Sequence, residues 1–340
     1  MNITFFIGNG FDLNLGLKTD YKSFLEYHKS KNYDDMLSKN INQDITAWAD
    51  LERALGAFTK NITSEDIDSF IESKCLLDES LSDYLLHIDT TNEILFGDKG
   101  HSEFRDRLIS FAKEFSEVDT MHYNEIIRST NEAIHYCFVS FNYTSFLDRI
   151  IDKAKNINPF CAHKTPSGTI NDCIYLPIHV HWKIGHNVLL GVNDLSQLEA
   201  ADDVKKALAP YMLKPDMNTA LGQRNITHVK TCINASQYII VYGMSIGATD
   251  LMWWSSLCEW LKGNKSRRLI LYIYHPKITL SSASRTLLFQ NKERKQFIRM
   301  AQYKTADIQE QIIVIPNSRT FSYNTIHVRE TQNNERAEAV

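Results

Sequence analysis

Short, almost entirely apolar runs recur along this chain, and segments with helical periodicity lie between several of them. Strands are predicted at residues 3–7, 136–141, 174–180, 188–190, 238–242, 269–274 and 312–315. Helices are predicted between the later runs, at 250–262 and 283–299. Strands that are apolar on both faces and alternate with helices are typical of a covered parallel sheet. The sequence therefore predicts an α/β fold, Rossmann-like, with a mostly parallel sheet and helices on both faces.

A long block at residues 21–125 is predicted to be mostly helical. Part of it repeats apolar residues at spacings of three and four, which places them on one helical face: Phe104, Leu108, Phe111, Phe115 and Val118. Residues 45–58 show the same periodicity. We expect an insertion that caps one end of the sheet, within a single domain spanning residues 1–330. Residues 331–340 are expected to form a polar, frayed tail.

Composition excludes several classes of protein. The 340 residues include 37 basic and 41 acidic ones, so a net charge of −4 argues against binding nucleic acid through a basic field. No apolar run is long enough to cross a membrane. The first apolar run lacks a preceding basic segment and breaks at Gly8, which is too early for a signal peptide. We therefore expect a cytoplasmic protein that does not contact a membrane.

The cysteines are scattered and form no Cys-x-x-Cys pair: Cys75, Cys137, Cys161, Cys173, Cys232 and Cys258. A structural zinc site usually needs such pairs, so we expect no metal. In a cytoplasmic chain these thiols are expected to be mostly buried small hydrophobes.

Two glycines, Gly8 and Gly10, follow the first predicted strand directly. Ligands of doubly wound sheets bind outside the carboxyl ends of the strands, where glycines let backbone N–H groups approach a phosphate. The third glycine of the dehydrogenase fingerprint is absent, because Leu13 stands in its place. A tight strand-to-helix turn with no ligand is the alternative interpretation.

Polar side chains follow two other strands. Asn142 comes after the second predicted strand and is suited either to fixing a ribose or a water, or to capping the next helix near Ser145. His179 and His181 end the third, where strand alternation predicts that they share one side. The pair lacks a clear third metal ligand, whereas one histidine suffices as a general base. A core or surface histidine is the alternative.

The segment Gly243-Met244-Ser245-Ile246-Gly247 supports two hypotheses. It matches the nucleophile elbow of a serine hydrolase. The remaining triad candidates would then be Asp250, Asp307, His275 and His327. It also suits a nucleotide-binding turn with Asp250 at a helix start. The elbow would come late in the chain and would leave the first glycine turn without a role, so the nucleotide turn is favoured.

Six motifs occur in the order found in the AbiH family of phage-defence proteins, which this chain resembles over roughly residues 3–260. They are Gly-Asn-Gly-Phe-Asp-Leu at 8–13, Gly-Leu-x-Thr-x-Tyr at 16–21, Trp-x-Asp-Leu-Glu at 48–52, Phe-Asn-Tyr-Thr at 141–144, His-x-His at 179–181, and Gly-x-Ser with a later Asp at 243–250. The ordered set is far more specific than any single motif. The resemblance implies a role in abortive infection.

The same order also looks like a diverged sirtuin-type NAD site. That likeness implies hydrolysis of NAD, as substrate, to nicotinamide and ADP-ribose. It assigns catalysis to Asn142, which orients the ribose or the attacking water, and to His181 as general base. The residues implied to bind the nucleotide are Gly8, Asn9, Gly10, Phe11, Asp12, Thr19, Thr144, Gly243, Ser245 and Asp250. Among them, the two first glycines would hold the pyrophosphate, and Ser245 and Asp250 the adenosine end.

Differences from sirtuins shape the alternatives. The zinc module that shapes the deacetylase peptide site is absent, which favours simple glycohydrolysis. Thr144 replaces an aspartate and Trp182 replaces a glycine. These changes motivate a second hypothesis, a nucleotide-binding sensor or complex subunit without turnover. An effector that depletes NAD must be silent until infection, so we expect a homo-oligomer or an activating protein partner. Glu52 is either a carboxylate that supports the site from behind or a solvated helix residue, and the solvated interpretation is favoured.

Overall fold

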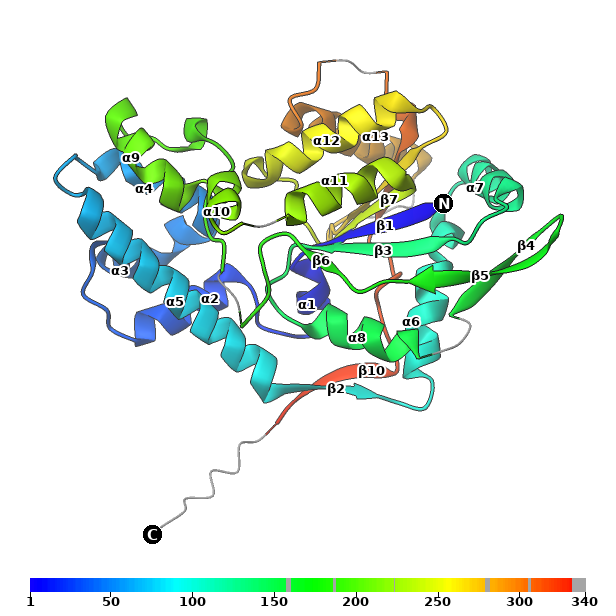
Figure 1. Ribbon diagram of the computed structural model, residues 1–340, viewed down its shortest axis with the longest axis horizontal. Helices are drawn as coiled ribbons and strands as arrows, with labels where there is room; N and C mark the ends of the chain where they lie inside the picture. The colour runs from blue at the N-terminus through cyan, green and yellow to red at the C-terminus, as the bar shows by residue number, and fades with distance from the viewer. Residues whose placement is uncertain (157–159, 186–187, 223, 279–281, 305–306, 332–340) are drawn as a thin grey trace, which may run out of the picture.

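The computed structural model describes residues 1–156, 160–185, 188–222, 224–278, 282–304 and 307–331. Within these ranges the central sheet has eight strands in the order β4-β5-β3-β1-β7-β8-β9, with β6 also beside β3 (Figure 1). All neighbours in it are parallel except β4 and β5. The strands are β1 (Asn2–Ile7), β3 (His135–Ser140), β4 (Cys161–Thr165), β5 (Gly168–Ile174), β6 (Ile178–His179), β7 (Ser236–Tyr242), β8 (Arg268–Ile273) and β9 (Ile312–Pro316). The predicted mostly parallel α/β fold is confirmed.

Side chains that alternate along the central strand enter two separate hydrophobic cores. Phe5 and Ile7 of β1 belong to the core on one face of the sheet, and Phe6 belongs to the core on the other. The first core is covered by α6 (Gly100–Ile109), α7 (Glu117–Ser129) and α8 (Phe146–Lys155). The second is covered by α11 (Asn225–Ala235), α12 (Leu251–Gly263) and α13 (Ala283–Met300). Both faces of the sheet are therefore covered, as the apolar runs predict (Figure 1).

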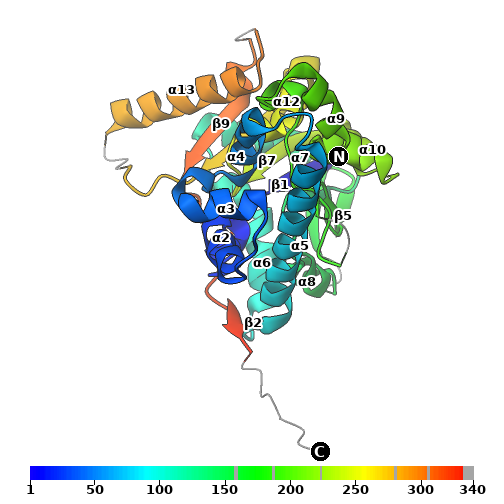
Figure 2. The same cartoon turned by 90° about the vertical axis from the view of Figure 1, so that its left-hand side faces the viewer.

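A third core lies in a helical cap beyond the carboxyl ends of the central strands (Figures 1 and 2). The cap comprises α2 (Tyr21–Ser30), α3 (Met36–Gln43), α4 (Leu51–Phe58), α5 (Ile67–Thr91), α9 (Asp202–Met212) and α10 (Lys214–Ala220). The short helix α1 (Gly10–Asn14) connects β1 to it. Because two distant segments build the cap, residues from 21–91 and from 188–222 meet above the edge of the sheet where ligands bind.

The strand prediction for residues 174–180 is wrong in extent. β5 ends at Ile174 and only Ile178 and His179 pair again, as β6. Pro177 lies between them and has no N–H group to donate to a ladder. The strand predicted at 188–190 is also wrong, because these residues join no ladder; nearby, Val192 makes an isolated bridge to Leu213. Burial explains their apolar character, because Leu189 is 1% exposed and Leu190 is part of the cap core.

The helical block also contains features that periodicity did not predict. The strand β2 (Asn92–Phe96) interrupts it and pairs antiparallel with β10 (Ile326–Glu330) in a separate two-stranded sheet. Val118 is 76% exposed, so the prediction of one continuous apolar face is wrong. The reason is that α6 ends before the short turn at Phe111 and Ser116 begins a new helix by capping α7, which resets the helical phase.

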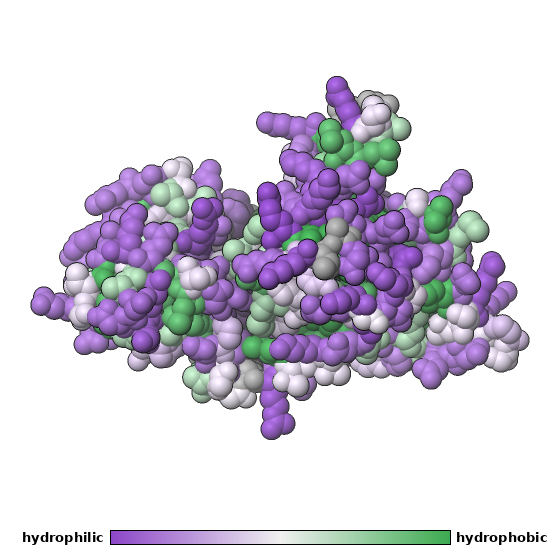
Figure 3. Space-filling view, turned by 90° about the horizontal axis from the view of Figure 1, so that it is seen from above, coloured by the Kyte–Doolittle hydropathy of each residue, from purple (hydrophilic) through white to green (hydrophobic). Residues whose placement is uncertain are grey.

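The cysteines are also less buried than predicted. All six are free thiols, and Cys258 is buried, whereas Cys75 and Cys173 are exposed. None of the helices in the described ranges is sufficiently long and apolar to span a membrane. The face of the molecule seen in Figure 3 is largely hydrophilic, with apolar side chains gathered only in small patches. Of the predicted polar tail, Thr331 donates a hydrogen bond to the carbonyl of Thr91, and residues 332–340 lie outside the described ranges.

Candidate functional site

A cavity of about 160 Å³ lies between the carboxyl edge of the sheet and the helical cap. The loops after β1, β3 and β7 form its floor, and residues from the cap close it. Its described lining comprises Gly8, Asn9, Asp12, Thr19, Tyr21, Asp50, Glu52, Leu81, Leu85, Phe141, Asn142, Tyr143, Thr144, His181, Lys214, Gly243, Met244, Ser245, Thr249 and Asp250. Ten of the twelve site residues predicted from the sequence therefore meet in one cavity.

The two predicted site residues that do not line the cavity are Gly10 and Phe11. Phe11 is fully buried in the core of the sheet, with its ring 5.8 Å from that of Phe321. Its place in the motif therefore reflects packing of the turn onto the sheet. Gly10 packs against the backbone of Gly243, to whose carbonyl its N–H donates.

The glycine turn after β1 packs against the turn after β7. The N–H of Gly8 donates to the carbonyl of Tyr242 at 2.9 Å, and that of Gly10 donates to the carbonyl of Gly243 at 2.8 Å. A Cβ atom at Gly10 would lie 2.5 Å from the Cα of Gly243, and one at Gly8 would lie 2.5 Å from the Cγ of Met244. Both glycines are thus required for close approach of the two turns, and both N–H groups already have acceptors.

Asp12 is fully buried at the base of the cavity and holds two neighbours. Its Oδ1 accepts from Nδ2 of Asn142 at 3.0 Å, and its Oδ2 accepts from Oγ1 of Thr144 at 2.6 Å. Burial raises the pKa of Asp12 to about 7, although these two hydrogen bonds oppose the rise. The alternative of Asn142 as a helix cap is wrong, because its amide binds Asp12 and Ser145 occupies the N-cap position of α8.

Three polar atoms on residues of the cavity are buried and have no hydrogen-bond partner among the described residues. One of them, Oδ1 of Asp250, lies in ion pairs with His181 and Lys214, which leaves Oδ1 of Asn142 and Nδ1 of His181 with neither kind of partner. Buried polar groups are nearly always hydrogen-bonded, so an orphaned pair in one cavity indicates a place for a ligand or water. Their positions coincide with the two residues predicted to be catalytic.

A chain of buried charges holds His181. Its Nε2 lies 3.3 Å from Oδ1 of Asp250, which also lies 3.6 Å from Nζ of Lys214. Lys214 forms a second ion pair, of 2.7 Å, with Oε2 of Glu52. Tyr21 donates to the other oxygen of Glu52 at 3.5 Å. The chain links the histidine to the helical cap.

The charge states in this chain follow from the pairing. Burial raises the pKa of Asp250, but the charge of Lys214 and the contact with His181 outweigh it and hold that pKa well below its usual value. Burial lowers the pKa of Lys214, yet the charges of Asp250 and Glu52 raise it above its usual value. Asp250 is therefore ionised and Lys214 is protonated near neutral pH.

His179 occupies a different environment from His181, so the prediction that they share one side is wrong. Its Nδ1 lies 3.0 Å from the carbonyl of Asn142 and its Nε2 lies 2.9 Å from Oδ2 of Asp148. The reason is that β6 ends at His179 and the chain bends at Val180. Strand alternation therefore stops before His181. In the described parts of the chain, no group of three histidine, cysteine or acidic residues could hold a metal ion.

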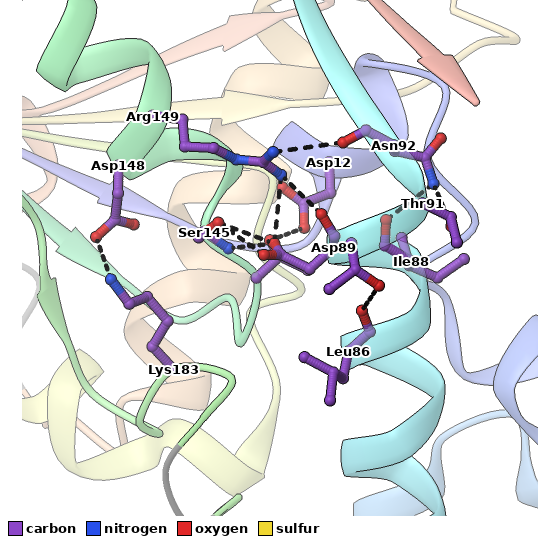
Figure 4. A network of polar contacts seen from close by, with 12 residues as sticks. Asp12, Leu86, Ile88, Asp89, Thr91, Asn92, Ser145, Asp148, Arg149 and Lys183 are labelled. Atoms are coloured by element: carbon purple, nitrogen blue, oxygen red, sulfur yellow. Dashed lines mark hydrogen bonds and ion pairs between the residues drawn. The ribbon is translucent and has the colours of Figure 1, made fainter. Parts of the chain in front are cut away.

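A second polar network supports the site from the side of α5 and α8 (Figure 4). Asp89, near the end of α5, accepts from the N–H of Ser145 at 2.8 Å and pairs with Arg149 at 3.5 Å. Arg149 also donates to the carbonyl of Asn92, beyond the end of α5. Asp12 lies beside this network, and the charge of Asp89 adds to the rise in its pKa. The network connects the start of α8 to the cap.

The triad of the serine hydrolase hypothesis is not assembled around Ser245. Asp250 pairs with His181, and His275 packs against Phe289 with ring centroids 5.6 Å apart. His327 lies on β10 in the two-stranded sheet, and Asp307 lies 3.9 Å from Lys265. Neither of the two triad histidines lines the described cavity.

Several lining residues were not predicted as part of the site. Glu52 was predicted to be solvated, but it is 6% exposed and paired with Lys214, so that prediction is wrong. Tyr21, Asp50 and Glu52 lie within the AbiH-like motifs at residues 16–21 and 48–52. Those motifs are the sequence signal that could have assigned these residues to the site. Lys214 had no local signal, because a lysine at a helix start is usually solvated.

Comparison with known proteins places the chain in a family. A family model described as bacteriophage abortive infection AbiH matches residues 4–272, which is more than half of the chain and includes every predicted site residue. No curated protein is matched by the sequence. The matched range contains the glycine turn, the two strand-end motifs and the acidic turn after β7. The chain therefore belongs to the AbiH family of bacteriophage abortive infection proteins.

Proposed function

We propose that this protein acts in abortive infection by hydrolysing NAD to nicotinamide and ADP-ribose, in a site of the sirtuin type. The observation that carries the proposal is the pair of buried atoms without partners, Oδ1 of Asn142 and Nδ1 of His181, on two residues of one cavity. A ribose hydroxyl or a water held between them would satisfy both.

The pairing of His181 defines the chemistry of its free nitrogen. Because Asp250 is ionised, it stabilises the tautomer in which Nε2 of His181 carries the proton. Nδ1 then holds a lone pair and can accept a proton as general base. Because Nδ2 of Asn142 donates to Asp12, the side-chain oxygen of Asn142 faces away from Asp12 and remains available as an acceptor.

The reaction breaks the bond between C1′ of the ribose and the nicotinamide nitrogen, and both bonding electrons leave with the nitrogen. The departing ring thereby loses its positive charge, so no general acid is needed. The ribose passes through a state resembling an oxocarbenium ion. Water adds to C1′ and gives its proton to His181, which yields ADP-ribose. Asn142 orients the ribose or the water by accepting a hydrogen bond.

A second candidate is a nucleotide sensor without turnover. Thr144 and Trp182, which replace an aspartate and a glycine of the sirtuin site, favour it. The cavity volume of about 160 Å³, well below the size of common ligand pockets, limits how much of a nucleotide can enter in either case. A cavity of similar volume in another protein holds one benzene. The glycohydrolase proposal requires that only one end of NAD enters, or that an activating partner or oligomer widens the site.

The test measures nicotinamide release and cellular NAD, with and without phage challenge. His181→Ala and Asn142→Ala are each expected to abolish NAD loss while the protein stays folded. His327→Ala, an exposed histidine outside the cavity, is the matched control and should keep the activity. If NAD stays level while the unaltered protein still protects the cells, the pocket is a sensor or acts on another nucleotide, and the catalytic roles of Asn142 and His181 are wrong. If either site variant keeps full activity, the catalytic roles are wrong.

A further inference from the structure

The cavity has an excess of negative charge. Four carboxyl groups line it, those of Asp12, Asp50, Glu52 and Asp250. Burial raises the pKa of Asp12 to about 7, so the negative charge rests mainly on the other three. In the described lining, Lys214 supplies the single ammonium group and arginine is absent. That ammonium already pairs with Glu52 at 2.7 Å and lies 3.6 Å from Asp250. No positive side chain of the described lining therefore remains for a phosphate.

The two backbone N–H groups that were expected to bind a phosphate are not available either. The N–H groups of Gly8 and Gly10, which the sequence suggested for the pyrophosphate, donate to the carbonyls of Tyr242 and Gly243. A phosphate in this cavity would be desolvated beside several carboxylates, which is unfavourable at low dielectric. The volume of about 160 Å³ has room for about one ring system.

The features that disfavour a phosphate in this cavity favour a cation. Carboxylates attract it, and the aromatic rings of Tyr21, Phe141 and Tyr143 also belong to the lining. The rings of Phe141 and Tyr143 lie with centroids 5.5 and 6.2 Å from the ring of His181, so they surround the proposed base. A flat, positively charged ring fits the size, the charge and the aromatic surface together.

Resting on the proposed function, we propose that this cavity is a cation-selective subsite that admits the positively charged base end of the nucleotide and leaves its phosphates outside. The substrate class is an N-glycoside whose base is cationic, such as oxidised NAD. The reduced, neutral form has the same phosphates but lacks the charge, so the cavity discriminates against it.

Asp50 offers a charge that can be removed without loss of structure. It lines the cavity but is exposed, which places it at the opening. Its carboxylate caps α4 by accepting from the N–H of Arg53 at 3.4 Å. Asparagine caps helices about equally well, so Asp50→Asn removes a charge and keeps the cap. Asp44→Asn is the matched control, because Asp44 is also an exposed N-cap residue, of the turn at Ile45–Trp48, and does not line the cavity.

The experiment measures binding of carbocyclic NAD by calorimetry, in its oxidised and reduced forms, to the full chain. A methylene replaces the ribose ring oxygen in these probes, so hydrolysis cannot occur. The oxidised form is expected to bind at least about tenfold more tightly than the reduced form. Asp50→Asn should lower that ratio severalfold, and Asp44→Asn should leave it unchanged. ADP-ribose, which lacks the base, should bind more weakly than the oxidised form.

Equal affinity for the two forms, or binding of ADP-ribose as tight as that of the oxidised probe, would overturn the inference. An unchanged ratio in Asp50→Asn would also contradict it. The proposed function can fail separately. If the oxidised probe binds selectively but the protein releases no nicotinamide from NAD, the subsite is confirmed and the hydrolysis is wrong. If the protein hydrolyses NAD but binds the two probe forms equally, the proposed function is correct and the cation-selective subsite is wrong.

Discussion

Nε2 of His181 lies 3.3 Å from Oδ1 of Asp250, and this contact joins the loop after β6 to the start of α12. Both side chains are largely buried, so solvent screens their attraction little. The contact favours the imidazole tautomer in which Nε2 carries the proton. It gives Asp250 a role that differs from holding the adenosine end, which the sirtuin likeness suggested.

Asp250→Asn is expected to lower kcat for nicotinamide release by about 10- to 100-fold, as loss of an orienting partner does elsewhere. The neutral amide can hold either tautomer of His181, so part of the population has its proton on Nδ1. The KM should rise by a smaller factor, because Asp250→Asn also removes one of the carboxylates that attract the cationic base. Steady-state kinetics beside circular dichroism of the folded protein check this. An unchanged kcat would show that Asp250 does not orient the histidine.

Stability should fall with rising pH because of Asp12. Its pKa is raised from 3.8 to about 7 in the folded state, so the folded protein holds the proton in a window where the unfolded chain has lost it. The contribution is fully present below pH 3.8. It is lost as pH rises to about 7, at about 1.4 kcal/mol for each pH unit. The groups facing Asp12 are Asn142, Thr144, Asp89 of α5 and His179 of β6.

Asp12→Asn removes this titration and keeps a polar side chain of similar size. The variant is therefore expected to lose less stability than the unaltered protein between pH 5 and 8, as measured by urea unfolding across that range. A control variant, Asp44→Asn, changes an exposed carboxylate and should keep the original slope. Parallel curves for the Asp12 variant and the unaltered protein would show that Asp12 does not titrate in this window.

Lys214→Met is expected to destabilise the protein by about 3–5 kcal/mol, because it leaves Glu52 and Asp250 as buried charges without their cation. The double variant Glu52→Gln with Lys214→Met should recover part of that loss, since one orphaned carboxylate is removed. Chemical unfolding of both single variants and the double variant completes the cycle. Strict additivity would mean that the two side chains do not interact.

Gly10→Ala is expected to destabilise the protein by about 1–3 kcal/mol or more, because its Cβ would meet backbone atoms rather than a side chain that can move. Gly247→Ala is the matched control in the neighbouring turn. Its Cβ would approach nothing closer than 3.9 Å, and its φ of −103° suits alanine. Thermal unfolding of the two variants should therefore differ clearly. Equal stability would show that the turns do not need to approach so closely.

Local patterns predicted the parts of the chain whose environment is uniform along several residues. The apolar runs around Phe5, Phe138 and Ile240 are buried on both faces of the sheet, so composition alone identified these strands. The order of the motifs also identified ten lining residues. Periodicity failed where a strand or helix is interrupted, as at Pro177 and Ser116, because one residue can reset the phase of a pattern.

The sequence by itself determined the α/β class, the covered parallel sheet and membership of the AbiH family, because apolar runs and motif order can be recognised without knowledge of tertiary contacts. Tertiary structure alone decided that Glu52 is buried, that Lys214 meets it and Asp250, and that the N–H groups of Gly8 and Gly10 are already bonded. The physical reason is that a charged residue has the same local pattern whether water or a distant partner satisfies it. Only the approach of segments far apart in the chain distinguishes the two.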